Sequence, residues 1–151
     1  MRGVTAKRKI LLAGRNEALL ARLRDIAQRF PGRVFPMGFT RTIERAMAAA
    51  DIAITKPGGL TTSECLAMAL PMIIVAPIPG QEGRNADFLL EAGVAVKAQD
   101  ASVLEYKLSQ LLQSAPRRAA MRERMHAIAR PDAAARVLAL VERQLCASAP
   151  G

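Results

Sequence analysis

The sequence is poor in aromatic side chains. It contains no tryptophan, one tyrosine and four phenylalanines among 151 residues. Single-stranded nucleic acids bind proteins partly by stacking their bases on aromatic rings, and no helix-turn-helix or zinc-finger pattern is present. We therefore do not expect nucleic acid as a partner, in spite of a formal net charge of +9. Aliphatic side chains must build most of the core.

Metal-binding and disulfide patterns are missing as well. The two cysteines, Cys65 and Cys146, lie far apart and match neither a zinc-ligand spacing nor a disulfide framework. The chain has no Asp-x-Asp pair, and its one histidine, His126, has no nearby acidic cluster to complete a coordination shell. We expect both cysteines to be reduced, packed thiols, and we expect no metal and no cofactor.

Long apolar runs are also absent. No segment approaches the roughly 18 residues of a membrane-spanning helix, and no signal peptide is recognisable, so we expect a cytoplasmic protein. Positive charge is densest in residues 117–130, which we call the basic cluster. Such clusters gain about 1 kcal/mol per basic residue near anionic lipid. An anionic membrane surface is thus an expected partner, with the protein held peripherally on its inner face.

The alternation of segments indicates the fold class. We predict tails at residues 1–8 and 147–151 and one domain over residues 9–146, because a chain of this length fits a single domain. Short apolar runs at residues 9–13, 33–37, 52–55, 72–76 and 94–98 predict strands. Between and after them we expect helices that begin near Asn16, Ile43, Thr61, Asn85, Asp100, Pro116 and Pro131. This order predicts an α/β fold, a Rossmann-like parallel sheet with helices on both faces.

Two loops after neighbouring predicted strands carry unusual chemistry. Lys56-Pro57-Gly58-Gly59 follows the third strand and precedes a helix, so its backbone can approach a ligand and the free N–H groups of the helix can bind phosphate. The sequence PIPGQE follows the next strand and places two polar side chains beside the first loop if the strands are neighbours. Neither GxGxxG nor GxxxxGK[ST] occurs, which argues against an ordinary dinucleotide site and a P-loop ATPase.

Residues 56–96, KPGGLTTSECLAMALPMIIVAPIPGQEGRNADFLLEAGVAV, resemble a known family. The stretch is similar to the C-terminal, nucleotide-sugar-binding half of GT-B glycosyltransferases. Within that family it looks nearest to monogalactosyldiacylglycerol synthases and processive diacylglycerol glucosyltransferases. It is more distantly similar to the N-acetylglucosaminyltransferase of peptidoglycan precursor synthesis. The resemblance covers residues 9–98.

The resemblance implies a binding site for a UDP-sugar donor. It places the uracil at the backbone near Phe39, the ribose hydroxyls at Glu64 and the diphosphate at residues 58–62. The corresponding contacts are expected from Gly14, Asn16, Phe39, Lys56, Gly58, Gly59, Thr61, Thr62, Glu64, Gln81, Glu82 and Asn85. Of these, Gln81, Glu82 and Asn85 would contact the hexose and the nearby phosphate. Lys56 or Arg84, with the helix N-terminus, would offset the charge of a departing UDP.

Each assignment has a structural alternative. Thr61 and Glu64 have the spacing of a capping box, in which the two residues satisfy helix N–H groups reciprocally. Asn16 can be no more than a helix cap, and Phe39 can be a loop residue packed on its own domain. Lys56, Gln81 and Glu82 can be solvated polar residues, and the glycine pair at residues 58 and 59 can be a plain turn.

The resemblance also implies what this chain would need for catalysis. Members of the family carry acceptor recognition and the general base in an N-terminal domain, for which this chain has no room. We expect the donor-binding domain of an inverting UDP-hexosyltransferase with a lipid acceptor such as diacylglycerol. Its expected partners are a UDP-sugar and either an N-terminal acceptor domain or a separate acceptor subunit. The alternatives are half of a sugar-nucleotide epimerase or hydrolase, and a non-catalytic nucleotide-sugar-binding module.

Overall fold

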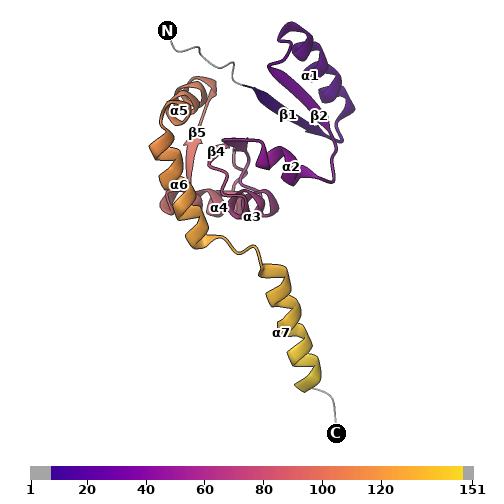
Figure 1. The fold of residues 1–151 in the computed structure, drawn as a ribbon, viewed down its shortest axis with the longest axis vertical. Coiled ribbons are helices and arrows are strands. Elements are labelled where there is room, and N and C mark those ends of the chain that lie inside the picture. Colours follow the sequence, from indigo (N-terminus) through magenta and orange to yellow (C-terminus); the bar gives the residue numbers. More distant parts are fainter. Residues whose placement is uncertain (1–7, 148–151) are drawn as a thin grey trace. The chain divides into compact units, whose positions relative to one another are not determined.

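The computed structural model describes the backbone of residues 8–147 and the side chains of residues 8–144 (Figure 1). All but residues 8 and 147 of the predicted tails lie outside the described residues. The strands are β1 (Lys9–Gly14), β2 (Val34–Gly38), β3 (Ala53–Thr55), β4 (Met72–Val75) and β5 (Ala95–Ala98). The helices are α1 (Glu17–Arg29), α2 (Ile43–Ala48), α3 (Gly59–Ala67), α4 (Gln81–Glu91), α5 (Ala101–Gln113), α6 (Ala115–Ile128) and α7 (Ala133–Ala147).

The chain forms two compact units, which meet in sequence between Ala46 and Met47. In the first unit β1 and β2 form a parallel pair, and in the second unit β3, β4 and β5 form a parallel sheet in that order. Successive strands of each sheet are joined through a helix, which confirms the predicted α/β class. The strand hydrogen bonds are thus divided between two sheets.

The first unit packs α1 on its two strands. Asn16 caps α1, since its side-chain oxygen accepts a hydrogen bond from the backbone N–H of Leu19 at 2.9 Å. Leu20 is the buried side chain of this helix. Pro36 lies inside β2, opposite Leu11 of β1, and is tolerated because β2 has a hydrogen-bonding neighbour on one side only.

Helices cover both faces of the second sheet. Met72 and Ile74 of β4 pack on one face with Cys65 of α3 and Leu89 of α4. Ile73 points to the other face and packs with Leu111 of α5 and Met121 of α6. Alternate residues of a strand face opposite ways, so β4 must be apolar throughout when both faces are covered. The unbroken run that predicted this strand is explained by that double coverage.

Several predicted helix starts need correction. α3 begins at Gly59, before Thr61, and α4 begins at Gln81, before Asn85. In both cases the N-cap is a glycine without a side chain to hydrogen bond, whereas the prediction used the first polar capping-type residue. α6 begins at Ala115 after the cap Ser114, with Pro116 in its first turn, and α7 begins at Ala133 instead of Pro131.

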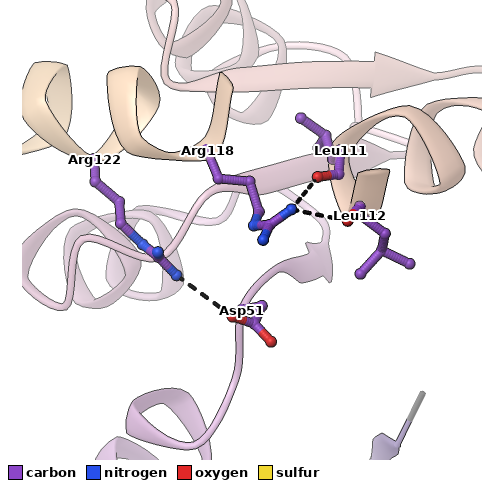
Figure 2. Close-up of polar contacts among 5 residues, drawn as sticks. All are labelled: Asp51, Leu111, Leu112, Arg118 and Arg122. Atoms are coloured by element: carbon purple, nitrogen blue, oxygen red, sulfur yellow. Dashed lines mark hydrogen bonds and ion pairs between the residues drawn. The ribbon is translucent and has the colours of Figure 1, made fainter. Parts of the chain in front are cut away.

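Part of the basic cluster binds other parts of the second unit. Figure 2 shows the guanidinium of Arg118 donating to the carbonyl oxygens of Leu111 and Leu112, and Arg122 pairing with Asp51 at 3.7 Å. The carbonyls belong to the last turn of α5, which has no intrahelical donors for them. Arg118, in α6, therefore supplies hydrogen-bond donors to the free carbonyl oxygens at the end of α5. None of the helices in the described part of the chain is long and apolar enough to cross a membrane.

Cys65 is a free, fully buried thiol, as predicted, while the side chain of Cys146 lies outside the described residues. Burial, and then the negative charge of Glu64, raise the pKa of the Cys65 thiol from 9.0 to about 11. The thiolate is the reactive form, so both the raised pKa and the burial suppress reaction.

Cys65 is expected to resist iodoacetamide in the native protein at pH 8 and to react rapidly once urea unfolds it. Because the folded-state pKa is raised, the thiol's contribution to stability is present below about pH 9 and is lost as the pH rises through about 11. Peptide mapping by mass spectrometry measures the alkylation of each cysteine separately. Equal labelling rates for Cys65 in native and unfolded protein would contradict its burial.

Candidate functional site

Two loops leave the same edge of the second sheet. β3 and β4 are adjacent and parallel, with Thr55 opposite Ile74, so the segments that follow them start side by side. We call residues 56–58 the glycine loop and residues 76–80 the proline loop. The predicted adjacency of the two loops is confirmed, because it required only that these strands be neighbours.

A single side-chain hydrogen bond joins the two loop regions. The amide nitrogen Nδ2 of Asn85, in α4, donates to the carbonyl oxygen of Pro57 in the glycine loop at 2.9 Å. Pro57 is fully buried and Asn85 is half-buried, so water competes little for this bond. Asn85 therefore fixes the glycine loop to the helix that follows the proline loop, and its Oδ1 has no hydrogen-bond partner among the described residues.

The N-terminus of α3 is uncapped. Gly58, the N-cap, has extended backbone angles and no side chain, and the first intrahelical bond runs from Thr62 N–H to the Gly58 carbonyl at 2.9 Å. The N–H groups of Gly59, Leu60 and Thr61 precede that bond and have no acceptor within the helix. Together with the helix dipole they form a positive, donor-rich end that suits an anion.

The glycine pair is not required by packing within the protein. A Cβ atom added to Gly58 or Gly59 would meet nothing within 4 Å, and neither residue has a positive φ. Alanine would therefore fit both positions as far as the protein is concerned. Space is left beside the backbone at the point where the free N–H groups emerge.

The proline loop is closed by Glu82. Its carboxylate oxygen Oε2 accepts a hydrogen bond from the backbone N–H of Ile78 at 2.8 Å. Gly80 adopts φ +103°, which only glycine adopts readily, and so turns the chain into α4. Glu82 thus has a structural bond, while the side chains of Gln81 and Arg84 in the same first turns are exposed.

The capping box, given above as the structural alternative for Thr61 and Glu64, does not form. α3 starts at Gly59, so Thr61 lies within the first turn and Glu64 lies farther along the helix, where it cannot reach the N-cap. Glu64 and Lys56 are both exposed. The ribose role of Glu64 and the charge-offsetting role of Lys56 stay predictions, and Glu64 has lost its structural alternative.

Thr62 differs from the other predicted contacts because its side chain is buried. It is 8% exposed, and its hydroxyl has no hydrogen-bond partner within the described residues. A buried hydroxyl without a partner is uncommon in folded proteins. The backbone N–H of Thr62 is also engaged, because it donates to the Gly58 carbonyl, so the predicted contact of Thr62 with the diphosphate stays a prediction.

The remaining predicted contacts lie in the first unit. Gly14, at the end of β1, adopts φ +58° and pairs with Gly38 of β2, so the loops after both strands start together. The Phe39 ring is 58% exposed, and the guanidinium carbon of Arg15 lies 4.7 Å from its centre, a cation–π contact. Phe39 and Arg15 thus form an exposed flat surface beside Asn16.

Sequence reasoning missed three residues near these loops. Arg15 sits between two predicted contacts, and its stacking could have been anticipated only from the pairing of β1 with β2. Leu60, in the first turn of α3, is 83% exposed, and Ile78, in the proline loop, is 56% exposed. These two exposed aliphatic side chains, one in the first turn of α3 and one in the proline loop, add apolar surface beside the polar groups of the second unit. No group of three or more His, Cys, Asp or Glu side chains within the described residues is placed to hold a metal.

Comparison with known proteins identifies the family of this chain. The model of the glycosyltransferase family 28 C-terminal domain matches residues 10–137, so the chain belongs to that family. A processive diacylglycerol beta-glucosyltransferase of Bacillus cereus (strain AH187) is 36% identical over 125 residues, which are 83% of this chain and 32% of that protein. A protein of the same name from Bacillus mycoides (strain KBAB4) is 33% identical over 129 residues, 85% of this chain and 33% of its own length.

Solved structures share the fold. The crystal structure of Acinetobacter baumannii MurG aligns with a TM-score of 0.66 at 20% identity, covering 93% of this chain and 51% of MurG. The glycotransferase of kitacinnamycin aligns with a TM-score of 0.60 at 16% identity, covering 95% of this chain and 45% of its own. The chain therefore has the fold of one half of GT-B glycosyltransferases, and it spans about a third of the length of its curated relatives.

Replacing Asn85 with aspartate is expected to destabilise the second unit by about 1–3 kcal/mol, because a carboxylate would face the Pro57 carbonyl where a donor now sits. Urea unfolding followed by circular dichroism measures the free energy of unfolding. Gln81→Ala is the matched control on the same helix, since the Gln81 side chain is exposed, and it should change the free energy by less than about 0.5 kcal/mol. Equal, small effects of both substitutions would show that the Asn85 bond does not hold the loops.

Proposed function

We propose that this chain is the donor-binding part of an inverting hexosyltransferase and that its ligand is a UDP-sugar. The observation that carries the proposal is the uncapped N-terminus of α3 beside the first turn of α4, held together by the Asn85–Pro57 bond. A diphosphate needs several N–H donors and a positive potential, which this helix end supplies without a metal. A hexose needs polar side chains beside the diphosphate, and Gln81 and the free Oδ1 of Asn85 are of that kind.

The proposed reaction places distinct demands on these residues. An acceptor hydroxyl attacks the anomeric carbon of the sugar from the face opposite UDP, the bond to the diphosphate oxygen breaks, and a base takes the hydroxyl proton. Negative charge grows on the leaving diphosphate as that bond breaks. The fixed N–H groups of Gly59, Leu60 and Thr61 would stabilise it without reorganising. The exposed side chains of Lys56, in the glycine loop, and Arg84, in the first turn of α4, would add positive charge.

The acceptor in this proposal is a lipid such as diacylglycerol. Support comes from the curated relatives, which are named processive diacylglycerol beta-glucosyltransferases, and from the exposed aliphatic side chains of Leu60 and Ile78 in the two loops. We further propose that the general base and the acceptor site are supplied by another domain or by a separate subunit. A peripheral position on an anionic membrane would bring the site to such an acceptor.

UDP is expected to bind the chain and to raise its melting temperature by mass action, with or without EDTA. Gly59→Ala should weaken UDP about tenfold, because the added Cβ would occupy the space beside the free N–H groups. Its free energy of unfolding should stay unchanged or rise by up to about 1 kcal/mol, since the position is helical and open. Calorimetric titration measures the affinity.

Ala67→Ser, at an exposed position at the other end of the same helix, serves as the control for Gly59→Ala and should bind UDP like the parent chain. A thermal shift with NAD or ATP but none with UDP would overturn the assignment of the ligand. If Gly59→Ala bound UDP with full affinity, the proposal that UDP binds at the N-terminus of α3 would be wrong.

Glu64→Gln tests the ribose contact. A carboxylate that accepts hydrogen bonds from both ribose hydroxyls loses about 1–3 kcal/mol of binding energy when it becomes an amide. Because Glu64 is exposed and takes no part in capping α3, thermal stability should be unaffected. Pyrophosphate, which lacks uracil and ribose, isolates the ribose contact. The substitution should weaken the binding of UDP and leave the binding of pyrophosphate unchanged. Unaltered UDP affinity would remove Glu64 from the site.

A further inference from the structure

The structure divides the arginines of the basic cluster into two groups. Arg118 and Arg122 turn toward α5 and Asp51, as Figure 2 shows, and Arg130 donates to the carbonyl oxygen of Ala129 at 2.8 Å. Arg117 and Arg124 instead line a cavity of about 360 Å³ between α6 and the start of β5. The cluster is therefore not one uniform positive surface.

The cavity has the make-up of a small-molecule site. Its volume lies near the lower end of the roughly 300–1,000 Å³ typical of ligand pockets. Ala95, Val96, Ala120 and Met121 form its apolar wall, and the two arginines supply the charge. Among the described residues that line it none is acidic, so the two guanidinium charges are not neutralised within the cavity.

The exposed side chain of Arg124 is oriented by a hydrogen bond to the backbone. One of its guanidinium nitrogens donates to the carbonyl oxygen of Gly93 at 3.3 Å. Gly93 adopts φ +67°, and a Cβ there would lie 3.1 Å from the same nitrogen, so glycine is what allows the guanidinium to lie against the backbone. Fixing one cation in advance lowers the entropy lost when an anion binds.

Arg117 completes the pair from the same helix. It lies two helical turns before Arg124, a spacing that puts both residues on one face of α6 over the cavity. Its side chain is exposed, and its guanidinium has no hydrogen bond or ion pair within the described part of the chain. Two guanidinium groups over one apolar hollow match a phosphate ester, which they can contact bidentately.

We propose that this cavity is a second anion site and that it binds a phosphate ester with a small apolar part. The site lies by the N-terminal end of β5, whereas the glycine loop and the proline loop follow the C-terminal ends of β3 and β4. Because the three strands are parallel, one site lies where the strands begin and the other lies where they end. The ligand is either a soluble organic phosphate or the headgroup of a phospholipid, which share this chemistry.

The test titrates the full chain with sn-glycerol 3-phosphate by calorimetry and, separately, with vesicles of phosphatidylcholine with and without phosphatidylglycerol. Arg117→Gln removes one charge from the cavity, and Ala120→Leu fills it without changing charge. Each should weaken the glycerol phosphate about tenfold, as expected for the loss of one charge-assisted contact or of the space itself. Arg122→Gln, a charge-matched change on the same helix that faces Asp51, should alter affinity less than twofold.

The outcomes show whether the site exists and, if it does, whether its ligand is a soluble ester or a lipid headgroup. Binding of glycerol phosphate alone identifies a soluble ester, and an added response to phosphatidylglycerol vesicles that Arg117→Gln reduces identifies a lipid headgroup. Equal losses for Arg117→Gln and Arg122→Gln, or no binding of either probe, would overturn the site. UDP affinity should be the same in all three variants, so failure here is distinguishable from failure of the donor-site proposal. Arg117 is exposed, so Arg117→Gln keeps the test decisive if Ala120→Leu does not fold.

Discussion

The candidate site depends on one hydrogen bond, from the Asn85 side chain to the Pro57 carbonyl. The two loops belong to successive crossovers and share no sheet hydrogen bonds beyond the ends of β3 and β4. Without this hydrogen bond, the free N–H groups of α3 and the polar first turn of α4 could move independently. With this hydrogen bond, the donor-rich end of α3 and the polar side chains at the start of α4 keep a fixed relation to each other.

Packing in the core limits what the Asn85 hydrogen bond has to hold in place. β4 is buried on both faces, and the helices α3 and α4 that carry the two loops pack through Cys65 and Leu89 on the same face of it. The helix bodies are thus fixed by close packing, which resists sliding. Only the loop ends retain freedom. Asn85 at one loop and Glu82 at the other remove part of that freedom through side chain to backbone bonds.

Much of the fold could be predicted from the sequence because its signals are local and strong. Two strands were predicted from the apolar runs at residues 9–13 and 72–76, and two helix starts from the capping residues Asn16 and Asp100. The structure confirms these four elements. Adjacency of the two loops followed from the parallel crossover rule. The GT-B resemblance agrees with the family match and with the MurG fold.

The details that failed depend on contacts distant in sequence or on absent side chains. α3 and α4 start at glycine caps that have no side-chain signal, so the capping box at Thr61 and Glu64 was a false pattern. The basic cluster has contacts that only tertiary packing could reveal, because Arg118 donates to α5 and Arg122 pairs with Asp51. Its membrane-facing role stays a prediction. The Arg15–Phe39 stack needed the β1–β2 register in the same way.

The central claim is that the glycine loop and the start of α4 form a single anion site. Two-dimensional amide NMR of the labelled chain during a UDP titration tests it most directly, because each backbone N–H reports its own surroundings. The account predicts that the amides of Gly59, Leu60 and Thr61 shift together with those of Gln81 and Glu82, with one common dissociation constant. Shifts confined to the cavity around Gly93, or different constants for the two segments, would contradict it.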